Sequence, residues 1–263
     1  MNRLRHLVLP IALVCGALQA AHAETPEEKG LAIAREADQR ENGFGDMTAD
    51  LSMVLRNKQG EESIREMRSK SLEVTNDGDK NLTIFDRPED VKGTALLTFS
   101  HKSDDDDQWL YLPALKRVKR IASDNKSGPF MGSEFAYEDI ASQEVEKYTY
   151  KYLRNEPLDG EDMFVFERYP VAKKSGYTRQ VVWMDTSEYR IHKIDYYDRK
   201  DSLLKTLTIS GYQRYLDKFW HPDEMMMINH QTGKSTELSW KNYRFATGMT
   251  DRDFDQNALK RAY

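Results

Sequence analysis

The sequence predicts a mainly β protein of the α+β class, built on one large curled antiparallel sheet with a few covering helices. Two observations predict this fold. Roughly ten to twelve segments alternate apolar and polar side chains, and short turn-forming runs separate them. Strong helix signals occur at one place, near the start of the chain. Because twisted strands make a sheet of that size curl, we expect its concave side to keep a partly open apolar cavity.

The first 23 residues have the pattern of a secretory signal. Two arginines precede an apolar run from residue 7 to residue 18, and the segment ends in Ala21-His22-Ala23, a small-x-small cleavage pattern. We therefore expect residues 1–23 to be cleaved on export. Cys15 is the single cysteine and lies in this segment, so the mature chain can form no disulfide.

The next stretch predicts a helix. Thr25 can cap it, Pro26 suits the first helical position, and Glu28 completes a capping box. Asn42-Gly43 predicts where the helix ends.

The remaining chain predicts strands joined by tight turns, such as those at Gln59-Gly60 and around Asn76 to Asp79. The expected strands cover residues 49–55, 63–74, 81–85, 94–100, 108–112, 145–153, 163–168, 177–184, 191–197, 203–212, 220–228 and 236–245. A short closing helix is expected within residues 251–263. No shift in composition divides the chain, so we expect residues 24–263 to form a single domain.

The charge balance argues against nucleic acid as the main partner. Removing Arg3 and Arg5 from the 39 Lys and Arg residues leaves 37 against 44 Asp and Glu, a net charge of −7. A nucleic-acid-binding protein favours a net basic surface. After the signal, no segment has the length of a transmembrane helix, so we expect no stable membrane insertion.

The histidines and acidic runs predict no metal site and no cofactor. His101 lies close to the run Asp104–Asp107, but consecutive aspartates lack the alternate spacing of a calcium loop. We interpret that run as the solvated tip of a hairpin. His192, His221 and His230 are not paired at the spacing of a zinc site.

Catalytic motifs are equally weak. Ser133 lies between a glycine and Glu134 but lacks the strand–turn–helix context of a nucleophile elbow. Glu138 and Asp139 could serve in acid–base chemistry if burial separated their pKa values, and they fit equally well as turn carboxylates. We therefore expect a protein that is not an enzyme, with an envelope hydrolase as the less favoured alternative.

A basic run extends from Lys116 to Arg120 on a predicted strand. Arg117 and Lys119 share one face of that strand and Arg120 lies on the other, so the strand could contact anionic head groups or an acidic partner. An equally good interpretation is an edge strand protected by its charges.

Phe130, Met131, Phe135 and Tyr137 lie on a segment too irregular for a core strand, among glycine, proline and serine residues. Bulky, flexible side chains on such a segment can cover an apolar pocket and adapt to its ligand. The alternative is a loop that merely plugs the sheet.

The stretch Trp109 to Ile140, with the sequence WLYLPALKRVKRI followed by SGPFMGSEFAYEDI, resembles the periplasmic outer membrane lipoprotein-sorting proteins, relatives of LolA and LolB. The aromatic strand that ends in proline, with Trp109 and Tyr111, is shared with those carriers. The resemblance implies an unclosed antiparallel barrel, covered by helices, around a cavity for acyl chains. It also implies a periplasmic location and links the group with RND/MMPL-type exporters in the inner membrane.

We therefore expect a monomeric periplasmic carrier or chaperone that binds lipid or an acylated protein and transfers it between envelope membranes. The expected rim or lid of its cavity consists of Trp109, Tyr111, Phe130, Met131, Phe135 and Tyr137. The alternative is an adaptor that uses Arg117, Lys119 and Arg120 to dock on an RND/MMPL-type exporter and carries no ligand.

Overall fold

A computed structural model describes residues 23–260 of the protein, except for the side chain of Ser123. Apart from Ala23, the predicted signal segment lies outside the described residues. Among the described residues, none of the helices combines the length and the apolar character that a membrane span requires.

Helix α1 (Pro26–Glu41) starts and ends where the sequence predicts. The Glu28 amide donates to Thr25 Oγ1 at 3.1 Å, and the Thr25 amide donates to Glu28 Oε2 at 2.8 Å, so the predicted capping box is confirmed. The helix packs against strand β7 through Gly30, where an added Cβ would lie 2.9 Å from the Tyr152 amide nitrogen. Glycine therefore permits a close approach of helix and strand that a larger residue would prevent.

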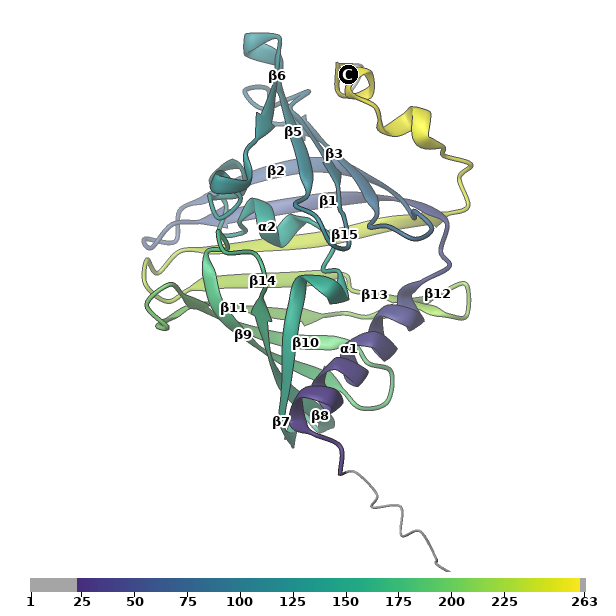
Figure 1. Ribbon diagram of the computed structural model, residues 1–263. Helices are drawn as coiled ribbons and strands as arrows, with labels where there is room; N and C mark the ends of the chain where they lie inside the picture. Colours follow the sequence, from purple (N-terminus) through teal and green to yellow (C-terminus); the bar gives the residue numbers. More distant parts are fainter. Residues whose placement is uncertain (1–22, 261–263) are drawn as a thin grey trace, which may run out of the picture.

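The sheet has 13 strands, all antiparallel, in the order β6-β5-β4-β3-β2-β1-β15-β14-β11-β10-β9-β8-β7 (Figure 1). The strands are β1 (Asp46–Arg56), β2 (Glu62–Leu72), β3 (Lys80–Arg87), β4 (Ala95–Phe99), β5 (Asp107–Leu112), β6 (Arg117–Ile121), β7 (Tyr148–Leu158), β8 (Glu161–Pro170), β9 (Tyr177–Asp185), β10 (Ile191–Asp198), β11 (Leu203–Ser210), β14 (Glu224–Asn229) and β15 (Ser235–Phe245). The predicted large antiparallel sheet is confirmed.

Two predicted strands are interrupted. The expected strand 203–212 ends before Gly211, and the expected strand 220–228 is broken at Pro222. The chain between β11 and β14 forms a separate hairpin. Gly211 has a φ of 69°, a conformation that strands do not use, and Pro222 has no amide to donate. The hairpin consists of β12 (Gln213–Tyr215) and β13 (Phe219–His221).

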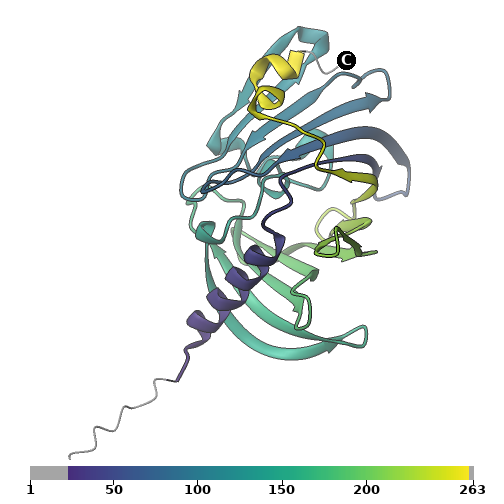
Figure 2. The same cartoon turned by 90° about the vertical axis from the view of Figure 1, so that its right-hand side faces the viewer.

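The sheet curls without closing, because its edge strands β6 and β7 are not paired with each other. In Figure 2 its two ends bend toward the same side, and α1 lies on that side. The largest apolar cluster lies on the concave face and combines residues from both ends of the sheet, among them Phe85, Leu96, Phe166 and Leu207. Strand twist explains the curl, and the shared core holds the two ends in place.

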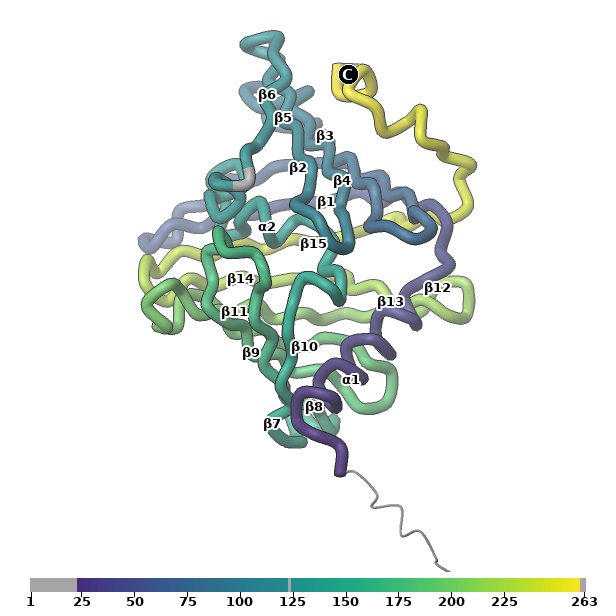
Figure 3. Tube along the Cα trace, in the orientation of Figure 1, coloured from purple at the N-terminus to yellow at the C-terminus, as the bar shows by residue number. Residues whose placement is uncertain are grey.

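The segment between β6 and β7, residues 122–147, is called the crossing segment because it runs over the concave face (Figure 3). Its amide at Glu134 donates to Thr236 Oγ1 of β15 at 2.9 Å, which places it over the middle of the sheet. It contains η2 (Ser123–Asn125), η3 (Phe130–Gly132), α2 (Tyr137–Ile140) and η4 (Val145–Lys147), and η1 (Pro113–Leu115) lies between β5 and β6.

The C-terminal segment covers part of the outer face. The turn η5 (Asp251–Phe254) packs on β3 and the helix α3 (Gln256–Lys260) packs on β4 and β5; Phe254 and Leu259 are both fully buried. The predicted closing helix is thus confirmed, starting five residues later than the expected range.

Candidate functional site

An apolar cavity of about 290 Å³ lies between the crossing segment and the concave face of the sheet. Phe130, Phe135 and Ile140 of the crossing segment form its roof. Its other walls come mainly from the inner faces of six neighbouring strands and include Leu51, Met53, Met67, Leu96, Met225, Leu238 and Trp240. An engineered apolar cavity of about 150 Å³ already binds benzene, so this one can hold part of an alkyl chain.

The four large residues that the sequence singled out in the crossing segment lie together. Phe130 is 1% exposed, and its ring lies 5.8 Å from that of Phe85 and 5.7 Å from that of Tyr137. Phe135 is 3% exposed. Met131 has a φ of 49°, and its carbonyl accepts a hydrogen bond from Arg65. Phe130 and Phe135 line the cavity, while Met131 and Tyr137 pack around them.

Trp109 and Tyr111 lie elsewhere, which corrects the grouping made from the sequence. Both side chains belong to the outer cluster beneath Phe254 and Leu259, not to the cavity. The residues of β5 that alternate with these two face the concave side of the sheet. Gln108 is one of them, and its Nε2 donates to the Tyr137 carbonyl of the crossing segment at 3.1 Å. Alternation predicted that these two aromatic residues share a face, but it could not say which face of the sheet is concave.

A buried ion pair anchors the crossing segment to β11. Lys205 Nζ lies 2.7 Å from Asp139 Oδ2, and the two side chains are 4% and 5% exposed. The Tyr177 hydroxyl and the Ala136 amide also donate to the Asp139 carboxylate, at 2.9 and 2.7 Å. Lys205 Nζ donates in addition to the Glu134 carbonyl at 2.8 Å. Both charged groups therefore have further hydrogen bonds besides the one that joins them, and a buried pair needs such bonds to offset desolvation.

Lys205 was missed from the sequence, although a signal was present. It shares the inward face of β11 with Leu207 and Ile209, and a lysine on an apolar face requires an acidic partner. The partner could not be identified, because Asp139 lies 66 residues away in the chain.

Two other acidic residues of the crossing segment are also anchors. Glu138 accepts from the Ser175 hydroxyl and the Gly176 amide, both at 2.8 Å, and burial raises the pKa of its carboxyl. Glu134 accepts from Asn229 Nδ2 at 2.7 Å. Glu138 and Asp139, the residues of the hydrolase alternative, thus hold the segment to the sheet, in agreement with their interpretation as turn carboxylates.

The basic run lies at the edge of the sheet. Arg117 and Lys119 of β6 are exposed, and Arg120 pairs with Asp107 on the neighbouring strand. None of the three lines the apolar cavity. This geometry fits both interpretations from the sequence, a protected edge and a contact surface, so the predicted contact with head groups or a partner stays a prediction.

Two of the histidines considered for metal binding, His101 and His192, contact carboxylates of the protein. His101 Nδ1 lies 2.8 Å from the Asp77 carboxylate. Among residues 23–260, the group with three possible ligand atoms within 4.8 Å of one another consists of Glu161, Asp185 and His192. Asp185 there already accepts from Arg190 at 2.8 Å and from the Glu188 amide at 2.6 Å, which makes it a structural carboxylate.

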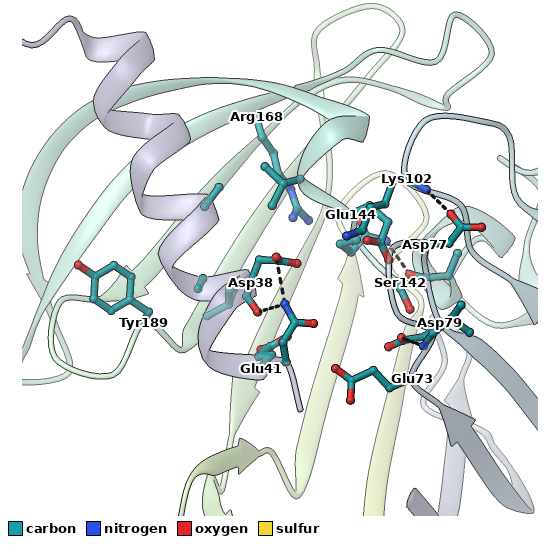
Figure 4. Close-up of a pocket in the computed structure, with 18 of the residues that line it drawn as sticks. Asp38, Glu41, Glu73, Asp77, Asp79, Lys102, Ser142, Glu144, Arg168 and Tyr189 are labelled. Atoms are coloured by element: carbon teal, nitrogen blue, oxygen red, sulfur yellow. Dashed lines mark hydrogen bonds between the residues drawn. The ribbon is translucent and has the colours of Figure 1, made fainter. Parts of the chain in front are cut away.

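A second, larger pocket of about 570 Å³ lies between α1, the turn at residues 73–79 and the end of the crossing segment (Figure 4). We call it the acidic pocket. Its carboxylates are Asp38, Glu41, Glu73, Asp77, Asp79 and Glu144, and its cationic side chains are Lys102 and Arg168. The sequence did not predict this pocket, because its residues come from segments that lie far apart in the chain.

The carboxylates of the acidic pocket affect one another. Burial raises the pKa of Asp79 to about 7, and repulsion from Glu144 and Glu73 adds to the increase. Among the described residues, the Asp79 carboxylate accepts one hydrogen bond, a long one of 3.3 Å from the Val74 amide. The folded protein therefore loses stability when Asp79 ionises.

We expect Asp79→Asn to raise the melting temperature by about 2–4 °C or more at pH 8 and much less at pH 4. The raised pKa of Asp79 makes the folded state bind a proton more tightly than the unfolded state, whose aspartate pKa is about 3.9. The penalty on stability therefore grows as pH rises from about 4 to about 7 and is constant above that. Thermal unfolding across this range, with the exposed Asp104→Asn as control, checks the sign. A gain that is independent of pH would contradict this account.

Comparison with known proteins agrees with the geometry. A family model described as "Uncharacterized protein" matches residues 77–261. A solved structure from Vibrio parahaemolyticus, named for outer membrane lipoprotein sorting, is 60% identical, covers 89% of this chain and 100% of its own, and has a TM-score of 0.88. The chain belongs to the LolA/LolB-like group of outer membrane lipoprotein-sorting proteins. No curated protein matches its sequence.

Two further solved structures are similar to this LolA/LolB-like chain. A DUF1329 family protein from Desulfovibrio piger is 32% identical, over 89% of this chain and 99% of its own, with a TM-score of 0.85. A LolA superfamily protein from Nitrosomonas europaea is 20% identical, over 87% and 98%, with a TM-score of 0.70, and shows the same fold. The resemblance stated from the stretch Trp109 to Ile140 is confirmed.

Proposed function

We propose that this LolA/LolB-like protein is a periplasmic carrier or chaperone that binds lipid, or the acyl chains of lipidated cargo, in its apolar cavity. It transfers this cargo between envelope membranes without covalent chemistry. One observation carries the proposal: the curled sheet and the roof of Phe130 and Phe135 leave about 290 Å³ that the protein's own side chains do not fill. The family's name for lipoprotein sorting supports the same role.

The energetics suit a carrier. Each methylene group buried in the cavity contributes about 0.8 kcal/mol, so part of an acyl chain supplies several kcal/mol of driving force. The volume lies at the lower end of the range for ligand pockets, roughly 300–1,000 Å³. A ligand that is only partly enclosed binds with moderate affinity, and moderate affinity allows both uptake and release.

The open cavity favours the carrier over the adaptor that carries no ligand. An adaptor needs no hollow interior, and a tightly packed core would make it more stable because empty cavities cost stability. Docking on an RND/MMPL-type exporter remains compatible with a carrier, and we propose that the exposed Arg117 and Lys119 on the edge strand β6 make that contact. Anionic head groups are the other partners that this basic edge fits.

Native mass spectrometry of the purified protein, followed by lipid extraction, tests the proposal. We expect a fraction of the protein to carry the additional mass of a lipid, and delipidated protein to bind a fluorescent fatty acid. If no lipid co-purifies and the delipidated protein does not bind the probe, the carrier function is wrong.

A further inference from the structure

The acidic pocket is separate from the apolar cavity. The two share no lining residue. Between them, Ser71 Oγ donates to Asn81 Oδ1 at 2.6 Å, and Asn81 Nδ2 donates to Ser142 Oγ at 3.5 Å. This chain of hydrogen bonds runs from β2 through β3 to the crossing segment. The acidic pocket therefore requires an explanation of its own.

Glu144 is the residue that points to a ligand. It is 8% exposed and lines the pocket, yet none of the described residues donates a hydrogen bond to its carboxylate or forms an ion pair with it (Figure 4). The nearby Lys147 pairs with Asp106 instead. Burial raises the pKa of Glu144. The Glu144 carboxylate oxygens are accessible from the pocket, so a hydrogen-bonding partner for them would come from there.

The surroundings of Glu144 favour a positive charge. Its pocket holds six carboxylates, those of Asp38, Glu41, Glu73, Asp77, Asp79 and Glu144, and two cationic side chains, those of Lys102 and Arg168. Arg168 already has partners, because its Nε donates to Gln180 at 2.6 Å and its guanidinium lies 4.7 Å from the centre of the Tyr148 ring. The excess of carboxylates attracts cations into the pocket.

The arrangement suits an organic cation better than a metal ion. No three carboxylates of the pocket bring ligand atoms within 4.8 Å of one another among the described residues. A metal ion needs its oxygen ligands gathered around one point. The pocket also has an apolar wall, formed by Phe44, Val145, Tyr150, Phe166 and Ile191. Dispersed carboxylates beside an apolar wall match a cation that carries a hydrocarbon group.

We propose that the acidic pocket binds a cationic amphiphile, with an ammonium group that donates to Glu144 and an apolar portion that packs on Val145 and Phe166. The ammonium group supplies the hydrogen bonds that the Glu144 carboxylate lacks. Glu41 on α1 and Asp79 in the turn at residues 73–79 also line the pocket and add attraction at longer range. This site is independent of the apolar cavity and does not require that the cavity holds lipid.

Isothermal titration calorimetry with octylamine, octanol and octanoate at pH 8 tests the proposal on the full-length mature protein. We expect octylamine to bind at least tenfold more tightly than octanol, and octanoate not to bind in this pocket. Glu144→Gln keeps the shape of the side chain and removes its charge, so octylamine affinity is expected to fall at least tenfold. The matched control Glu27→Gln, an exposed carboxylate on α1, is expected to keep the wild-type affinity.

Two outcomes overturn the proposal. One is equal affinity for octylamine and octanol, which would mean that charge plays no part. The other is an unchanged octylamine affinity in Glu144→Gln with an intact thermal transition, which would place any amine binding elsewhere on the acidic surface. Failure of the lipid-carrier function would appear separately, as a loss of fluorescent fatty-acid binding, because the two ligands use different pockets.

Discussion

Lys205→Met is expected to lower the free energy of unfolding by about 3–5 kcal/mol, because it leaves the buried Asp139 carboxylate without its cation. The Tyr177 hydroxyl and the Ala136 amide would still donate to Asp139, but neither neutralises its charge. Urea unfolding monitored by circular dichroism measures the change. The crossing segment is expected to detach first, since Lys205 also donates to the Glu134 carbonyl.

Two further variants show whether burial is the cause. The double variant Asp139→Asn, Lys205→Met removes both charges, so it is expected to recover much of the lost stability. Lys193→Met is the matched control on the neighbouring strand β10, where Lys193 Nζ lies 2.9 Å from Asp195 and the lysine is partly exposed. We expect the control to cost no more than about 1 kcal/mol. A cost for Lys205→Met as small as that of the control would show that the buried pair contributes little.

Ser69→Phe is expected to weaken the binding of a fluorescent fatty acid at least tenfold while the protein stays folded. Ser69 lines the apolar cavity from the inner face of β2, two residues after the buried Met67. A phenylalanine there extends into volume that is empty, so it competes with the ligand rather than with the core. The serine hydroxyl makes only a long hydrogen bond of 3.4 Å to the Ala49 carbonyl, so its removal costs little.

The control for Ser69→Phe lies on the same strand. Glu66→Phe places the same side chain on the exposed, outer face of β2, so it is expected to leave fatty-acid affinity unchanged. Wild-type affinity in a folded Ser69→Phe protein would mean that acyl chains bind outside the cavity. The proposed carrier site would then be wrong even if the protein binds lipid.

Most of the fold could be predicted from local patterns. The capping box of Thr25 and Glu28 acts over three residues, and tight turns such as Gln59-Gly60 act over even fewer. Interruptions at Gly211 and Pro222 were missed, because the alternation on both sides of them is that of a strand. The resemblance carried by residues 109–140 added the family and the unclosed barrel, which alternation alone does not specify.

The candidate site was predicted in part. Phe130 and Phe135 were predicted to cover a pocket, and both line the apolar cavity; their contact with a ligand stays a prediction. Trp109 and Tyr111 were grouped with them, and the structure places both beneath α3 instead. Alternation of apolar and polar residues assigns the side chains of a strand to two faces, but it does not show which face is concave. Only the curvature of the sheet decides which face lines the cavity.

By itself, the sequence determined the strands, the first helix and the family, and it predicted an export signal. All of these depend on residues close together in the chain. The tertiary structure alone decided that Asp139 meets Lys205, that Glu144 has no side-chain partner among the described residues, and that the crossing segment leaves a cavity beneath it. Such features depend on how separate segments fill three-dimensional space. A cavity is volume that no residue occupies, and no local pattern in the chain records it.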